Sequence, residues 1–177
     1  MFPKFLILMV CILLSFEVFS EEAIENIPRE KTKILNNWEV VSGLKSVNEK
    51  KYKGSQKEIF KKQKGQVMLK RTRRKGQALL NVENEDEAQV VYNPKRRASG
   101  TIDGTLIIYF NQMVDQKEVL KNFPIKKMRQ EAGLKFGIYK VKAGNDIEKV
   151  VEDLKKDPRV NNVEVEVLSS NRSIKPL

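Results

Sequence analysis

The last third of the chain alternates segments of strand character with segments of helix character, and this order restricts the fold more than any other feature. The strand segments are rich in β-branched and aromatic residues and cover Leu106–Phe110, Ile125–Gln130, Phe136–Lys142 and Val160–Val167. The helix segments cover Asp115–Asn122 and Asp146–Lys156. A β-α-β-β-α-β order is typical of ferredoxin-like folds, in which both helices cover one face of an antiparallel sheet. We therefore predict an α+β, ferredoxin-like open sandwich in residues 101–177, with the other sheet face free for a partner.

The second helix segment has the clearest periodicity in the chain. Its apolar residues follow the spacing i, i+3, i+4, i+7 of a helix that lies on a sheet, namely Ile147, Val150, Val151 and Leu154. Asn145 or Asp146 can cap its first turn, and Pro158 prevents its continuation. These residues are structural. The core predicted from the strands consists of Leu106, Ile108, Phe136, Ile138, Val160 and Val163.

The amino-acid sequence around this helix is more distinctive than its periodicity. Asp146–Leu154 is followed by Lys-Lys-Asp-Pro-Arg-Val and then by Val163-Glu164. Together with the strand Gly137–Val141, this pattern resembles the propeptide domain of subtilisin-type serine proteases over about Thr105–Glu166. The resemblance implies a protein that docks its sheet on the protease. Since no protease domain follows, we expect the chain to act in trans, as an inhibitor or a folding chaperone.

The closing strand supplies two candidate protease-binding residues. Glu164 and Glu166 alternate with valines, so both carboxylates point to one face of the sheet. On this pattern alone they belong to a solvated strand face. The resemblance implies instead that Glu164 accepts hydrogen bonds from the free N–H groups of helices on the protease. Glu166 is offset from the family position.

The C-terminal tail supplies the other candidates. The resemblance implies that the tail enters the active-site cleft as an added strand, with apolar side chains in two pockets. The residues concerned are Ile174, Lys175, Pro176 and Leu177. Two alternatives are a frayed terminus and occupation of the cleft by a segment near Leu168.

Residues 1–20 read as a signal peptide, with an apolar run at Phe5–Leu14 that is too short to cross a bilayer. The alternative is an uncleaved anchor. Cleavage before Glu21 removes Cys11, the only cysteine, so no disulfide is expected. We predict a secreted or periplasmic protein.

The absence of histidine excludes Ser-His-Asp and Cys-His nucleophile systems and imidazole metal sites. The acidic residues show no pairing of the kind that carboxylate catalysis needs. We therefore expect no enzyme activity, no cofactor, no metal and no small-molecule substrate.

The formal net charge is +11, and most of the excess lies between residues 21 and 100. We predict a largely disordered basic leader at 21–65, then short strands or a hairpin and a linker at 66–100. Basic clusters either remain solvated or bind a polyanion or anionic surface. The candidates for polyanion binding are Lys70, Arg71, Arg73, Arg74 and Lys75.

Two further functions stay open. One is a nucleic-acid-binding module that uses Tyr109, Phe136 and Tyr139 as stacking aromatics, although the surrounding residues fit the RNA-recognition pattern poorly. The other is a non-inhibitory adaptor in interaction with another protein.

Overall fold

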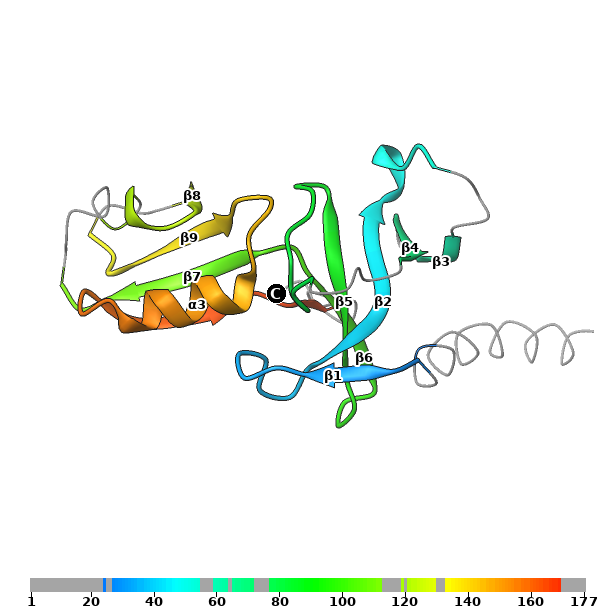
Figure 1. Ribbon diagram of the computed structural model, residues 1–177, viewed down its shortest axis with the longest axis horizontal. Coiled ribbons are helices and arrows are strands. Elements are labelled where there is room, and N and C mark those ends of the chain that lie inside the picture. Colours follow the sequence, from blue (N-terminus) through cyan, green and yellow to red (C-terminus); the bar gives the residue numbers. More distant parts are fainter. Residues whose placement is uncertain are drawn as a thin grey trace, which may run out of the picture.

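The chain is mostly β-structure and forms two antiparallel sheets, as the computed structural model shows in Figure 1. The structure describes residues 24, 27–54, 59–63, 65–71, 77–112, 119, 121–129 and 133–169. The strands of the larger sheet are β1 (Arg29–Lys31), β2 (Glu39–Asn48), β3 (Ile59–Gln63), β4 (Gln66–Lys70), β5 (Glu87–Asn93), β6 (Ala98–Ile102) and β11 (Leu168–Ser169). The strands of the smaller sheet are β7 (Thr105–Phe110), β8 (Ile125–Arg129), β9 (Phe136–Val141) and β10 (Val160–Val165).

The seven-stranded sheet is built around β2. Its strand order is β11-β6-β5-β2-β4-β3, and β1 also pairs with β2. The pairing of β2 with β5 shifts register between Val40 and Lys45. Gly43 lies inside this irregularity with a φ of 74°, a left-handed conformation that glycine adopts at little cost. A 3-10 turn, η1 (Glu49–Lys51), follows β2.

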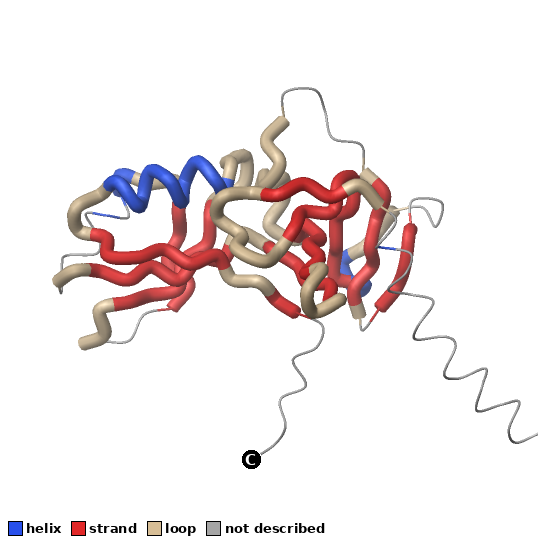
Figure 2. The backbone as a smooth tube through the Cα atoms, turned by 90° about the horizontal axis from the view of Figure 1, so that it is seen from below, coloured by secondary structure: helices blue, strands red, loops and turns tan. Residues whose placement is uncertain are grey.

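The four-stranded sheet has the order β10-β7-β9-β8 and carries α3 (Ile147–Lys156) on one face, as Figure 2 shows. The carboxylate of Asp146 caps α3 by accepting a hydrogen bond from the Glu148 N–H at 2.9 Å. The predicted stripe of apolar side chains on α3 is buried. This confirms the predicted helix, and the four predicted strands of this region are also present.

Two antiparallel strands run from one sheet into the other. β6 continues through Asp103 and Gly104 into β7, and β10 continues through Glu166 into β11. Between the sheets, the Glu166 N–H donates to the Thr105 carbonyl oxygen at 2.9 Å. Hydrogen bonding between the strands therefore continues across the junction between the two sheets.

One hydrophobic core serves both sheets. Its buried members include Leu35, Val40, Leu80, Val82, Val91 and Ile102 from the first part of the chain, Leu106, Ile108, Phe110, Tyr139 and Val141 from the smaller sheet, and the α3 stripe. A second cluster lies on the opposite face of the larger sheet and contains Ile24, Val41, Leu44, Met68, Val90 and Tyr92.

The predicted fold class is wrong. The described residues do not form a ferredoxin-like sandwich with two helices, because α3 is their only complete α-helix and most of them belong to β-sheets. The predicted helix Asp115–Asn122 lies mostly outside the described residues. Local periodicity identified the C-terminal elements, but it carried no information about the larger sheet that they continue.

The expected disordered leader is also corrected. Between residues 27 and 63 the described part of the chain holds β1, β2, η1 and β3. Val40, Val41 and Leu44 are almost completely buried because β4 and β5, which follow later in the chain, pair with β2. Such non-local partners are invisible in a local window of sequence. Residues 1–20, the predicted signal peptide, lie outside the described residues.

Within residues 66–100, where we predict short strands or a hairpin, the segment 77–82 is irregular and supports α3. The Val82 N–H donates to the Asn145 carbonyl oxygen at 3.1 Å, and the Ile147 N–H donates to the Leu80 carbonyl oxygen at 2.8 Å. The segment therefore fixes the start of α3 to the first part of the chain. None of the helices that the structure describes has the length and apolar character that a bilayer crossing requires.

Candidate functional site

The candidate site is the face of the four-stranded sheet opposite α3, which we call the outer face. Side chains alternate across a sheet, so the neighbours of the buried Leu106, Ile108 and Tyr139 point away from α3. They are Ile107, Tyr109, Phe136 and Ile138. Figure 2 shows no described helix or strand on this side of the sheet.

These four side chains form a continuous platform. Ile107 pairs with Ile138 and Tyr109 pairs with Phe136 in the register of β7 and β9. The rings of Tyr109 and Phe136 lie 5.8 Å apart between centroids at an interplanar angle of 40°, within the range of favourable aromatic pairs. Phe136 is 37% exposed, so the platform presents an aromatic ring to solvent.

One end of the platform is bordered by ion pairs with the first part of the chain. Lys126 Nζ lies 2.7 Å from Glu85 Oε1, and Lys140 Nζ lies 3.0 Å from Asp103 Oδ2. The hydrogen bond from Lys126 holds the pKa of the Glu85 carboxyl below its ordinary value. At Asp103, burial raises the pKa, but hydrogen bonds from Thr105 and Lys140 outweigh it and the net pKa is lowered. These cations are therefore already neutralised by carboxylates of the same chain.

The predicted binding residues of β10 lie at the opposite border. Glu164 is paired with Ile107, so its exposed side chain belongs to the outer face, and it accepts a hydrogen bond from Asn162 Nδ2 at 3.2 Å. Glu166 is half-buried in the junction between the sheets. The tail residues Ile174, Lys175, Pro176 and Leu177 lie outside the described residues.

The predicted polyanion site is only partly described. Lys70 ends β4, and its ammonium lies 5.4 Å from the centroid of the Phe60 ring. Arg71 forms an ion pair with Glu87 at 3.7 Å. Arg73, Arg74 and Lys75 lie outside the described residues. Both described cations thus have intramolecular partners.

The arrangement is suited to binding a partner. Among the described residues, no group of three or more Cys, Asp or Glu side chains could hold a metal ion. The outer face offers an apolar platform with one exposed carboxylate, Glu164, at its border, and this carboxylate accepts a hydrogen bond from Asn162. Such a surface buries apolar area against a partner and orients that partner through a polar contact.

Prediction placed two residues of the platform in the core. Phe136 and Ile138 face outward, whereas Gly137, Tyr139 and Val141 face α3. The first inward residue of β9 is Gly137, which has no side chain to mark it as apolar. The apolar Phe136 and Ile138 therefore suggested the opposite alternation of inward and outward positions. Tyr139, proposed as a surface aromatic, is fully buried and meets Phe110 edge to face at 6.2 Å.

A family model described as the open reading frame 2 N-terminal domain matches residues 28–174. No curated protein and no solved structure matches the chain. The resemblance to the subtilisin propeptide family is therefore wrong. Its motif combined an amphipathic helix, an Asp-Pro stop and an alternating strand, which any helix packed on a sheet can share. With the match spanning most of the chain, this protein belongs to the open reading frame 2 N-terminal domain family.

Proposed function

We propose that this protein is an exported, non-catalytic binding protein that docks another protein on its outer face. The observation that carries the proposal is the platform of Ile107, Tyr109, Phe136 and Ile138, which no other element of the described chain covers. Full burial of an aliphatic or aromatic side chain contributes about 1.5–3 kcal/mol. Central aromatic residues dominate the affinity of many protein interfaces.

The partner predicted from the sequence is a subtilisin-type serine protease, which the protein would inhibit or help to fold. The family resemblance that suggested this partner does not hold, so the protease remains a prediction. The exposed Glu164 supports a contact with a donor-rich part of any partner, since a carboxylate strengthens hydrogen bonds from free N–H groups.

The docking proposal is tested with variants of the platform. A photoreactive amino acid at position 136 should crosslink a partner in the exported fraction of the native host, whereas one at position 168 should not. Leu168 is a matched control because it is also an exposed apolar residue, at 48%, but lies in the larger sheet. With the partner purified, the double variant Tyr109→Ala/Phe136→Ala should weaken binding at least about tenfold, or about 1.4 kcal/mol. Unchanged affinity would contradict the proposal.

The same variants test the alternative partners. Inhibition constants against a panel of subtilisin-type proteases decide the protease prediction. Binding of a single-stranded oligonucleotide with strong salt dependence, lost in the double variant, would favour the nucleic-acid alternative instead. The neutralised Lys126 and Lys140 argue against that outcome, because phosphate binding needs free cations.

A further inference from the structure

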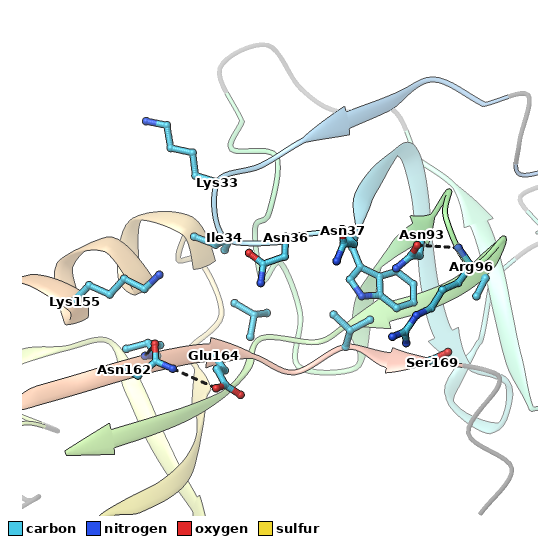
Figure 3. A pocket seen from close by; sticks show the side chains of 15 residues that line it. Lys33, Ile34, Asn36, Asn37, Asn93, Arg96, Lys155, Asn162, Glu164 and Ser169 are labelled. Carbon is cyan, nitrogen blue, oxygen red and sulfur yellow. Dashed lines mark hydrogen bonds between the residues drawn. The ribbon is translucent and has the colours of Figure 1, made fainter. Parts of the chain in front are cut away.

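We propose a second binding site, beside the outer-face platform and with Glu164 at the border of both, in which an extended acidic peptide adds as a strand to the free edge of β10. The site is a groove of about 750 Å³ between the two sheets, which we call the junction groove. Its walls include Lys33, Trp38, Arg96 and Lys155, and its floor includes Val165 and Val167. Figure 3 shows Lys33 in the loop before β2, Arg96 in the turn before β6 and Lys155 at the end of α3.

The floor of the groove is an unpaired strand edge. β10 lies at the end of its sheet and, in the described structure, pairs with β7 alone. The Glu166 N–H donates to the Thr105 carbonyl oxygen, so in this register the hydrogen-bonded pairs include Glu164 with Ile107. Val165, between them, belongs to a pair without hydrogen bonds, and its N–H and carbonyl point away from β7. These groups are available to a further strand.

Part of the same edge is closed by a side chain. The Val163 N–H, which also points away from β7, donates to the Asn162 Oδ1 at 2.9 Å. A strand that reaches Val163 must displace this amide, whereas Val165 needs no rearrangement. The peptide therefore enters from the side of Val165 and Val167, where Gly100 lies between Val167 and the Trp38 ring.

The charge of the groove selects the peptide. Lys33, Arg96 and Lys155 line it, and none of their side-chain cations forms an ion pair within the described structure. Glu164 is the one carboxylate among the groove residues. Elsewhere, exposed lysines do meet carboxylates, as in Lys62 with Glu49 at 3.1 Å and Lys126 with Glu85 at 2.7 Å. These three cations, which have no carboxylate partner among the described residues, give this cleft an excess positive potential that attracts an anionic ligand.

Specific contacts also fix the shape of the groove. The Arg96 N–H donates to the Asn93 Oδ1 at 3.1 Å, which fixes the turn that carries the guanidinium. The backbone N–H of Trp38 donates to the Leu35 carbonyl oxygen at 2.9 Å, which fixes the backbone at Trp38. At Gly100, an added Cβ would lie 3.2 Å from the Trp38 ring and 2.8 Å from Val167, so glycine makes room for the indole. The volume falls within the range of about 300–1,000 Å³ that is usual for ligand sites.

Because a free edge and a set of cations meet in one groove, a peptide that supplies both backbone groups and carboxylates fits better than a simple anion. A four-residue strand spans about 13 Å, and its alternate side chains would face the cations. Strand addition supplies affinity through backbone hydrogen bonds, while the flanking charges supply specificity.

The test uses the only tryptophan of the chain, Trp38, as an internal reporter. The full-length protein is titrated with acetyl-Val-Glu-Val-Asp-Val-amide, and tryptophan fluorescence and calorimetry are recorded. Matched probes are the Gln/Asn version of this peptide and a version with alternate backbone nitrogens methylated. We expect the acidic peptide to change the fluorescence and each matched probe to bind at least about tenfold more weakly.

Variants of the protein complete the test. Arg96→Gln should weaken the acidic peptide about fivefold or more, whereas Lys62→Gln, which removes the same charge from a paired lysine far from the groove, should leave it unchanged. Equal binding of the methylated peptide, or an equal response to sulfate or an oligonucleotide alone, would overturn strand addition. Absence of any peptide binding by both methods would overturn the site. None of these outcomes depends on Tyr109 or Phe136, so this site and the outer face fail or succeed separately.

Discussion

At the scale of single residues, Asp103 is the polar contact that joins the turn between the sheets to the smaller sheet. Its Oδ1 accepts hydrogen bonds from the Thr105 N–H at 3.0 Å and the Thr105 hydroxyl at 2.7 Å, and its Oδ2 accepts one from Lys140 at 3.0 Å. Burial alone raises the pKa of Asp103, but these donors hold it below its ordinary value of 3.8. The carboxylate therefore stabilises the folded state.

The pH dependence of stability follows from this lowered pKa. The contribution of Asp103 is fully present above the ordinary value of 3.8 and is lost as the pH falls through the lower pKa of the folded chain. We expect Asp103→Asn to lower the free energy of unfolding by about 1–2 kcal/mol at pH 7 and by less at pH 2. Urea denaturation at both pH values measures this. The control Asp153→Asn removes an exposed carboxylate and should cost under about 0.5 kcal/mol.

The two aromatic residues of β9 should respond in opposite ways. Tyr139 is fully buried in the core, so Tyr139→Ala should lower the free energy of unfolding by about 3–5 kcal/mol. Phe136 is partly exposed on the outer face, so Phe136→Ala should cost less than about 1.5 kcal/mol and act on partner binding instead. Thermal unfolding of both variants measures the difference. Comparable losses of stability would mean that the outer face is covered within the protein.

At the scale of secondary-structure elements, α3 was predictable and β2 was not. The cap, the apolar stripe and the stop of α3 all lie within one short segment, so the sequence contains the evidence locally. In β2, polar residues interrupt the apolar ones, and Lys45 and Ser46 are themselves buried. Alternation is weak in such a strand, and only its distant partners make it stable.

Gln89 shows how those distant partners stabilise β2. Its Nε2 donates to the carbonyl oxygens of Val41 at 3.3 Å and Leu44 at 2.9 Å, which flank the irregularity at Gly43. We expect Gln89→Leu to leave these acceptors unsatisfied in the interior and to lower the free energy of unfolding by about 1–3 kcal/mol. Chemical denaturation measures this cost. An unchanged free energy would show that water reaches the irregularity.

At the scale of the whole molecule, one hydrophobic core is shared by the two parts that we predict from the sequence, the leader and the C-terminal unit. Leu35, Val40 and Leu80 pack in the same cluster as Leu106 and the α3 stripe. The composition and charge of the first half suggested solvated chain because its apolar residues are few and scattered. These few apolar residues suffice to fold the first half only because the smaller sheet and α3 bury them.

A fragment that begins at Gly100 tests this unity. The fragment keeps most of β6 and all of β11 but lacks every other described strand of the larger sheet. It exposes core residues that pack against the first part of the chain in the full-length protein. We expect the fragment to show no cooperative thermal transition, whereas the full chain unfolds in a single transition. A cooperative transition in the fragment would establish two independent folding units.

The short strand β11 has a consequence for the order in which the protein folds during synthesis. In the described chain, the outer edge of β6 is covered only by Leu168 and Ser169, which pair with Thr101 and Gly100. Until those late residues leave the ribosome, the larger sheet keeps an open edge, and its closure requires contacts that are far apart in sequence and therefore slow to form. If the chain is exported as we propose, this delay keeps it incompletely folded while its first part is handed to the translocation machinery.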